Sequence, residues 1–244
     1  RDDVPVTITA SFDEAPYGAP TVTITGSGVT AVSDSMSGSG TSWTYIWTPG
    51  GDGAATVSVS AQDQAGNSAT VAGGSVTSYT VDNTAPTATL SEKEGSAATD
   101  RFVRSGTPVT LAISAGENLS TSTVTITGTG VTAVSTGMSG SDTSWSYTWT
   151  PGGDGTATVG ISIQDLAGNS ATINGAATYT LDNTAPVVTL SGTEGGVATD
   201  TYVRDDVPVT ITASFDEAPY GTPTVSITGT GVAAVSTGMS GSGT

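Results

Sequence analysis

The stretch Val81-Asp82-Asn83-Thr84-Ala85-Pro86 recurs 100 residues later as Leu181-Asp182-Asn183-Thr184-Ala185-Pro186. Each copy follows a Tyr-Thr pair at the end of one apolar and polar alternation, and each precedes a new apolar run. A long internal repeat that is flanked in this way by predicted strands is typical of a linker between two repeated domains. The stretch therefore divides the chain into modules of about 100 residues, a size that can bury its own core.

The repeat predicts three segments. Residues 1–82 are a module that lacks its first strand, residues 83–182 are a complete module, and residues 183–244 are a module that lacks its last strands. The segment Arg1–Thr41 matches Arg204–Thr244 almost residue for residue, whereas the corresponding part of the complete module has diverged. Two module types therefore alternate, and we expect the sequence to be a window on a longer repetitive protein.

The composition favours β-structure over helix. Ser, Thr, Gly, Val and Ala dominate, while residues that favour helices, such as Leu, Lys, Glu and Gln, are scarce. Hydrophobic residues make up 35% of the chain, which suits thin domains of two sheets. The alternation of Thr with Val and the regular Trp residues argue against disorder. We therefore predict an all-β fold.

Seven short strands with turn signals between them are expected in the complete module, which fits an antiparallel β-sandwich of immunoglobulin-like topology. A chain that enters such a sandwich at one end and leaves at the other would stack tandem modules end to end. Between strands we expect a flexible turn at Ser37–Gly40, a hairpin turn at Pro49–Gly53 and a long loop at Ser91–Arg104. The predicted strands are Thr87–Leu90, Thr107–Ser114, Thr123–Thr127, Val131–Ser135, Trp145–Thr150, Thr156–Gln164 and Thr178–Leu181.

One predicted strand per module carries aromatic residues on a single face. Trp145, Tyr147 and Trp149 alternate with Ser and Thr, and the same spacing recurs within Trp43–Trp47. The aromatic face is expected to be the core face, because large aromatic side chains are usually buried. The alternative is an exposed platform on which carbohydrate stacks.

The charge balance limits the partners. The formal net charge is −17 with five basic residues, whereas nucleic-acid binding needs a basic footprint. Nucleic acid and anionic membrane surfaces are therefore not expected partners. No stretch approaches the roughly 20 apolar residues that cross a bilayer, so no membrane insertion is predicted in this segment. The acidity has two compatible explanations: a soluble surface, and a set of oxygen ligands for divalent cations.

Catalysis is not expected. The chain has no Cys and no His, so it lacks thiolates, the usual zinc ligand and the commonest general base. Ser and Thr are plentiful, but there is no evident base to activate them. A glycosidase needs one acid held in an apolar cleft, which acids in Gly- and Asn-containing loops do not indicate. We predict no catalytic residue and no organic cofactor.

Two paired motifs resemble a known family. Asp-x-Ala-Gly-Asn occurs at Asp63–Asn67 and Asp165–Asn169, and each copy is followed by Asp-Asn-Thr-Ala-Pro, at Asp82–Pro86 and Asp182–Pro186. The chain thus resembles the bacterial immunoglobulin-like repeats of giant surface adhesins, including the extender repeats of type-I-secreted RTX and biofilm-associated adhesins. The resemblance implies an extracellular stalk at the bacterial cell surface that projects a distal binding domain. It also implies calcium at the domain junctions.

Calcium takes six to eight oxygen ligands, chiefly carboxylates and carbonyls. The expected topology brings acidic residues from the linker, from two loops of the complete module and from one turn of the preceding module to a single junction. Because their charges repel one another, we predict that a calcium ion clamps the junction and stiffens the chain. The residues at this junction are Asp52, Asp82, Asn83, Glu117, Asp165 and Asn169.

Equivalent sets are expected in the other two modules. The alternative explanation is that these Asp and Asn side chains only make turn hydrogen bonds. The equivalent residues are Asp13, Glu14, Asp63 and Asn67 in the first module, and Asp182, Asn183, Asp216 and Glu217 in the third.

Three functions compete at this stage. The leading one is a passive stalk whose partners are neighbouring repeats in the same chain. The second is a subunit of an extracellular filament or matrix, in which identical chains supply the missing strands to one another. It applies if the sequence is the whole protein. The third is direct recognition of a ligand such as carbohydrate, which near-identical tandem modules make less expected.

Overall fold

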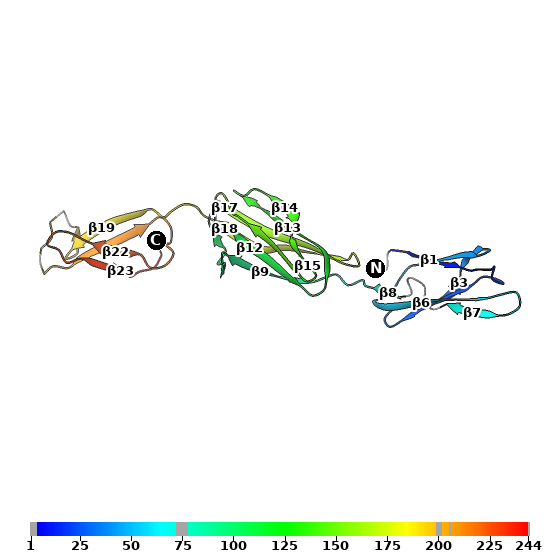
Figure 1. Cartoon of the computed structure of the whole chain (residues 1–244). Helices are drawn as coiled ribbons and strands as arrows, with labels where there is room; N and C mark the ends of the chain where they lie inside the picture. Colours follow the sequence, from blue (N-terminus) through cyan, green and yellow to red (C-terminus); the bar gives the residue numbers. More distant parts are fainter. Residues whose placement is uncertain (1–3, 72–77, 199–201, 205, 244) are drawn as a thin grey trace. The chain divides into compact units, whose positions relative to one another are not determined.

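The computed structural model describes residues 4–71, 78–198, 202–204 and 206–243 (Figure 1). Every regular element in these ranges is a β-strand, and the predicted all-β fold of antiparallel immunoglobulin-like sandwiches is confirmed. The chain divides into two compact units, Arg1–Asp182 and Asn183–Thr244. None of the described residues forms a helix that could span a membrane.

The described residues in the first part of the first unit form a sandwich of eight strands. One sheet has the order β1-β5-β4, and the other has the order β3-β2-β6-β7 with β8 also paired to β6. The strands are β1 (Val6–Ser11), β2 (Thr21–Gly26), β3 (Val32–Ser35), β4 (Ser37–Ser39), β5 (Ser42–Trp47), β6 (Gly53–Gln62), β7 (Ser68–Val71) and β8 (Ser78–Val81).

The second part of this unit is a fuller sandwich, with sheets in the order β10-β9-β12-β16-β15 and β11-β18-β17-β13-β14. Its core takes residues from both sheets. The strands are β9 (Ala88–Glu94), β10 (Ala97–Ala98), β11 (Phe102–Val103), β12 (Val109–Ala115), β13 (Leu119–Thr129), β14 (Val134–Gly137), β15 (Ser139–Ser141), β16 (Ser144–Trp149), β17 (Gly155–Asp165) and β18 (Ser170–Leu181).

In the part of the second unit that the structure describes, the strands form two small sheets, β20-β19-β21 and β22-β23. Every strand pairing among the described residues joins strands of one segment, 1–82, 83–182 or 183–244. The strands of this unit are β19 (Val188–Glu194), β20 (Val197–Ala198), β21 (Val209–Phe215), β22 (Thr224–Ile227) and β23 (Val235–Gly238).

The aromatic face predicted for β5 and β16 is the core face. Trp149 is buried and meets Tyr179 edge to face, with ring centroids 5.6 Å apart. Trp47 and Tyr79 repeat this contact at 5.7 Å in the first sandwich. Edge-to-face contacts of buried rings add to the hydrophobic gain. The remaining aromatic residues of both strands are partly buried and pack against the same cores, so neither strand is an exposed carbohydrate platform.

Two predicted turns differ from the structure. Residues 37–39 of the expected flexible turn form β4, which pairs with β5. This pairing depends on Gly38, where an added Cβ would lie 2.4 Å from the Ser42 carbonyl oxygen. The predicted hairpin at Pro49–Gly53 is wrong, because it joins β5 of one sheet to β6 of the other. It is a crossover between sheets, and this places its Asp52 beside the outgoing linker.

The predicted long loop at Ser91–Arg104 also contains strands. β9 extends to Glu94, and β10 folds back on it. β11 then pairs with β18 in parallel, the one parallel pairing among the described strands. The sequence pattern could not reveal β11, because a strand of two residues has no alternation to read.

Candidate metal centre

The candidate metal centre lies at the end of the second sandwich where the linker from the first arrives. β17 ends at Asp165 and β18 begins at Ser170, so the two strands are joined by a tight loop. Asp165 holds this loop through its carboxylate. Its Oδ1 accepts from the amides of Gly168 and Asn169 at 2.7 and 2.9 Å, and its Oδ2 accepts from Asn169 Nδ2 at 2.8 Å. The Asp165 side chain is therefore fixed and almost fully buried, at 1% exposure.

Three carboxylates from separate segments meet at this end. One carboxylate oxygen each from Asp82, Glu117 and Asp165 lies within 4.8 Å of the others. Asp82 comes from the linker, Glu117 from the loop between β12 and β13, and Asp165 from the last position of β17. This is the only such gathering of acidic residues in the part of the chain that the structure describes. Nothing neutralises it there, since none of the three forms an ion pair with a described residue.

Electrostatics at Glu117 follow from this crowding. Burial, and then the negative charges of Asp82 and Asp165, raise the pKa of Glu117 above its ordinary value. A carboxyl whose pKa is raised in this way resists ionisation, and a bound cation would remove that resistance.

The linker is held against the same loop by direct hydrogen bonds. Asn169 Nδ2 donates to the main-chain oxygen of Asp82 at 3.0 Å, and Asp82 Oδ1 accepts from the Thr84 amide at 3.0 Å. Asn169 thus contributes its amide nitrogen to the junction and positions the linker. Its predicted role as an oxygen ligand stays a prediction.

The donor set fits a hard cation. All three side chains offer carboxylate oxygens, which calcium and magnesium prefer, and they offer no nitrogen or sulfur. Three carboxylates can supply up to six oxygens, and main-chain carbonyls or water can complete a calcium shell. The residues that would hold the ion are Asp82, Glu117 and Asp165.

Asp52 and Asn83 are not part of the carboxylate group and contact each other instead. Asp52 Oδ1 accepts from the Asn83 amide at 2.6 Å, and Asp52 Oδ2 accepts from Thr84 Oγ1 at 3.3 Å. Asn83 Nδ2 donates to the Gly51 carbonyl at 2.6 Å. The first sandwich therefore holds the linker that leaves it by hydrogen bonds. Thr84 and Gly51 take part in these bonds, which the sequence pattern did not indicate.

In the first sandwich, the equivalent residues surround one hollow of about 180 Å³. Asp13, Glu14, Asp63 and Asn67 all line it. Asp63 accepts from Asn67 Nδ2 at 2.7 Å and from the Asn67 amide at 2.8 Å, as Asp165 does in its own loop. The hydrogen bond from the Asn67 side chain is the main reason that the pKa of Asp63 lies below its ordinary value. Turn hydrogen bonds thus explain Asp63, but they do not explain why Glu117 lies beside Asp82.

The residues expected in the third segment are divided between the two units. Asp182 ends the first unit, where its amide donates to the Val103 carbonyl at 3.0 Å. In the second unit, the Asp216 carboxylate accepts from the Val187 amide at 2.7 Å, and the Asp216 amide returns a bond to the Val187 carbonyl at 3.2 Å. Asn183 is exposed and Glu217 is half-buried.

The match to a family model spans the linker that carries the repeated motif. Residues 140–237 match the bacterial Ig-like domain (group 3). The matched stretch begins in β15 and ends in β23, so it includes the Asp165–Asn169 loop and the Asp182–Pro186 linker. No curated protein matches the chain.

Residues 140–237 are therefore similar to a bacterial Ig-like repeat, and the antiparallel sheets formed by β9 to β18 are consistent with this similarity. Domains of this family are structural and non-catalytic, and they are common in surface and extracellular proteins.

Proposed function

We propose that the chain is a stalk segment of a bacterial surface adhesin, in which calcium stiffens the junctions between neighbouring Ig-like modules. The observation that carries this proposal is the meeting of Asp82, Glu117 and Asp165, one from the linker and two from the next module. The neighbouring repeats are the partners, and the segment lies outside the cell. The match to a bacterial Ig-like domain supports the surface location.

Calcium would stiffen the junction because it offsets the repulsion among the three carboxylates. Without a cation, three crowded carboxylates repel one another, and the linker can relieve this by moving Asp82 away. A cation bound by all three requires the linker to stay beside the loops. Such binding stabilises the ordered junction by about 2.7 kcal/mol when the ligand is at 100 times its dissociation constant.

Two further contacts limit how far the linker can move. Asn169 holds the Asp82 carbonyl from the second sandwich, and Asp52 holds the Asn83 amide from the first. Calcium then has to fix only the side chains of a linker whose main chain is already held. A site that is partly ordered in advance binds with a smaller loss of entropy.

Small-angle scattering of the whole chain, in calcium and then in excess chelator, tests the proposal together with thermal melting. Calcium is expected to give a longer, narrower particle and a higher melting temperature. If neither quantity responds to calcium, the stiffening role is wrong. The native mass of the same samples tests filament assembly, which predicts multiples of the 23.9 kDa chain.

A further inference from the structure

The first and last strands of the second sandwich run in the same direction. β9 begins opposite Ala115, and β18 begins just after the Asp165 loop, both at the end that holds the three carboxylates. β9 ends opposite Val109, and β18 ends at Leu181, both at the far end. Tension on the two linkers therefore pulls the start of β9 and the end of β18 apart along the strands. The pairings of these strands are then loaded in shear, and their hydrogen bonds share the load.

The segment between β9 and β12 is tied to β18 by main-chain bonds. The Thr180 amide donates to the Arg101 carbonyl at 2.9 Å, and the Asp182 amide donates to the Val103 carbonyl at 3.0 Å. These bonds accompany the parallel pairing of β11 with β18, and the Val103 side chain is buried beneath them at 2% exposure. Any sliding of the first strand past the last must carry this segment with it or break these bonds.

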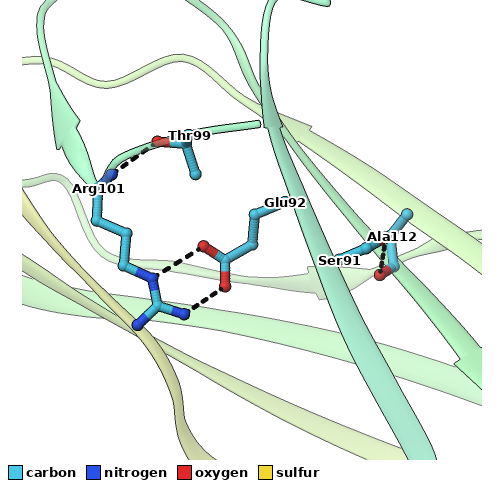
Figure 2. A network of polar contacts seen from close by, with 5 residues as sticks. All are labelled: Ser91, Glu92, Thr99, Arg101 and Ala112. Atoms are coloured by element: carbon cyan, nitrogen blue, oxygen red, sulfur yellow. Dashed lines mark hydrogen bonds and ion pairs between the residues drawn. The ribbon is translucent and has the colours of Figure 1, made fainter. Parts of the chain in front are cut away.

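The side chain of Arg101 ties the same segment to β9. Arg101 Nε and an Arg101 terminal nitrogen donate to the two carboxylate oxygens of Glu92 at 3.2 and 3.0 Å (Figure 2). The Glu92 side chain is only 10% exposed, whereas the Arg101 side chain is 51% exposed, so the pair lies at the surface with its carboxylate turned inward. The Arg101 amide also donates to Thr99 Oγ1 at 2.9 Å, which supports a backbone with a φ of 71°. Bidentate pairs of this kind are stronger and more directional than single ion pairs.

We propose that Glu92 and Arg101 form a mechanical staple, which joins the first strand to the last and makes this module resist stalk tension. This rests on the proposed stalk function. The Arg101 side chain donates to Glu92 on β9, and the Arg101 carbonyl accepts from Thr180 on β18. Sliding of one strand past the other must therefore break one of these bonds.

The other module type lacks this staple. Glu92 and Arg101 correspond to Gly192 and Thr201 in the third segment, so both partners are replaced together. Replacing both avoids leaving the Glu92 carboxylate, which is only 10% exposed, without its partner. Alternating modules would then differ in their resistance to force, and the modules without the staple would extend first under overload.

Single-molecule pulling of the whole chain tests the staple. The chain has no Cys, so one Cys added at each end gives defined attachment points. Unfolding of Ala88–Leu181 should release roughly 300 Å, at about 3.4 Å per residue. The double variant Glu92→Gly/Arg101→Thr, which copies the third segment, should unfold in this step roughly tenfold faster at a fixed force. Lys93→Thr, the exposed neighbour on β9 changed to its own third-segment counterpart, should leave the rate unchanged.

Equal unfolding rates for the parent and the double variant would overturn the staple. If the double variant does not fold, hydrogen exchange in the parent protein tests the proposal instead. The Thr180 and Asp182 amides should exchange hydrogen far more slowly than the amides of the exposed linker, and fast exchange at both would contradict the proposal. Pulling in calcium and in chelator separates the two proposals, because the staple contains none of the proposed calcium ligands. Its effect should be the same in both conditions even if calcium proves irrelevant.

Discussion

Asn169 donates its side-chain amide to the main-chain oxygen of Asp82 at 3.0 Å, although the two residues are 87 positions apart. The same amide nitrogen donates to Asp165 Oδ2 at 2.8 Å. The Asn169 side chain therefore fixes the Asp165 carboxylate and also holds the linker that carries Asp82. Hydrogen bonds from Asn169 to a main-chain oxygen and to a carboxylate thus organise the junction.

Asn169→Ala should weaken calcium binding at this junction. The change removes the bond to the Asp82 carbonyl and one bond to the Asp165 carboxylate, so both groups lose their fixed positions. Loss of residues that orient metal ligands typically costs 10- to 100-fold in affinity. Isothermal titration of the whole chain with calcium measures this. Asn67→Ala is the matched control, because Asn67 closes the same turn with no described bond to a linker. Equal losses in both variants would contradict the role of Asn169.

Glu117→Gln should have opposite effects with and without calcium. Without calcium, the change removes one of three crowded negative charges, so the melting temperature should rise in chelator. In calcium, it removes a proposed ligand, so the rise in melting temperature on adding calcium should shrink. Glu14→Gln changes the equivalent residue in the first sandwich, outside the carboxylate group. A variant that melts lower than the parent in chelator would show that the three charges do not repel in the fold.

The raised pKa of Glu117 sets the direction of a pH effect. In chelator, the folded state holds the Glu117 proton more tightly than the unfolded state, so this group's contribution to stability falls as pH rises from 4.5 through the raised pKa. Acidification should therefore stabilise the parent relative to Glu117→Gln. In calcium the sign reverses, because protonation of a ligand releases the ion. Melting curves of both proteins between about pH 4.5 and pH 7 test this. The pKa of Asp63 is lowered in the folded state, so its contribution to stability is lost as pH falls through that lowered pKa. Both proteins contain Asp63, so this contribution cancels when their melting temperatures are compared.

The sequence was most informative where spacing alone decides the structure. The alternation along β16 assigned Trp149 to the aromatic face, which is buried, and the linker repeat placed Asp82 at the boundary between two modules. The expected topology placed Asp82, Glu117 and Asp165 at one end, and there the structure brings them together. This step needs only the order of the strands, since loops at the same end of a sandwich are neighbours.

Features that depend on single backbone angles or on short contacts were not predictable. Arg101 has a φ of 71°, and nothing in a run of mixed polar residues indicates that β11 will pair in parallel with β18. The sequence predicted Asp52 at the end of the first sandwich from which the linker leaves, and the structure shows it there. Its partners, however, are a main-chain amide and a hydroxyl group of the linker. Patterns of residue type do not reveal such contacts, because any linker residue can present its amide.

Asp52→Ala should loosen the linker without unfolding the first sandwich. The change removes the two bonds in which the Asp52 carboxylate accepts from the Asn83 amide and from Thr84 Oγ1. Because the site is exposed, water replaces these bonds, and the unfolding free energy should fall by about 1 kcal/mol or less. Hydrogen exchange at the Asn83 amide should quicken clearly. Asp34→Ala is the control, since among the described residues Asp34 accepts only from the adjacent Ser35 amide. Unchanged exchange at Asn83 would mean that Asp52 does not hold the linker.

Tyr179→Phe should leave the protein as stable as the parent or stabilise it by about 1 kcal/mol. The Tyr179 hydroxyl is buried and has no hydrogen-bond partner among the described residues. Burial, and then the nearby Glu92 carboxylate, raise the pKa of Tyr179, yet that carboxylate is already paired with Arg101. Removing the hydroxyl removes an unsatisfied polar group and keeps the ring contact with Trp149. Guanidinium chloride unfolding measures the change, and Tyr79→Phe is the control because Tyr79 makes the same ring contact with Trp47 but is only half-buried. A loss of more than about 1 kcal/mol at Tyr179 alone would show that its hydroxyl is hydrogen-bonded in solution, with Glu92 as the nearest charged acceptor.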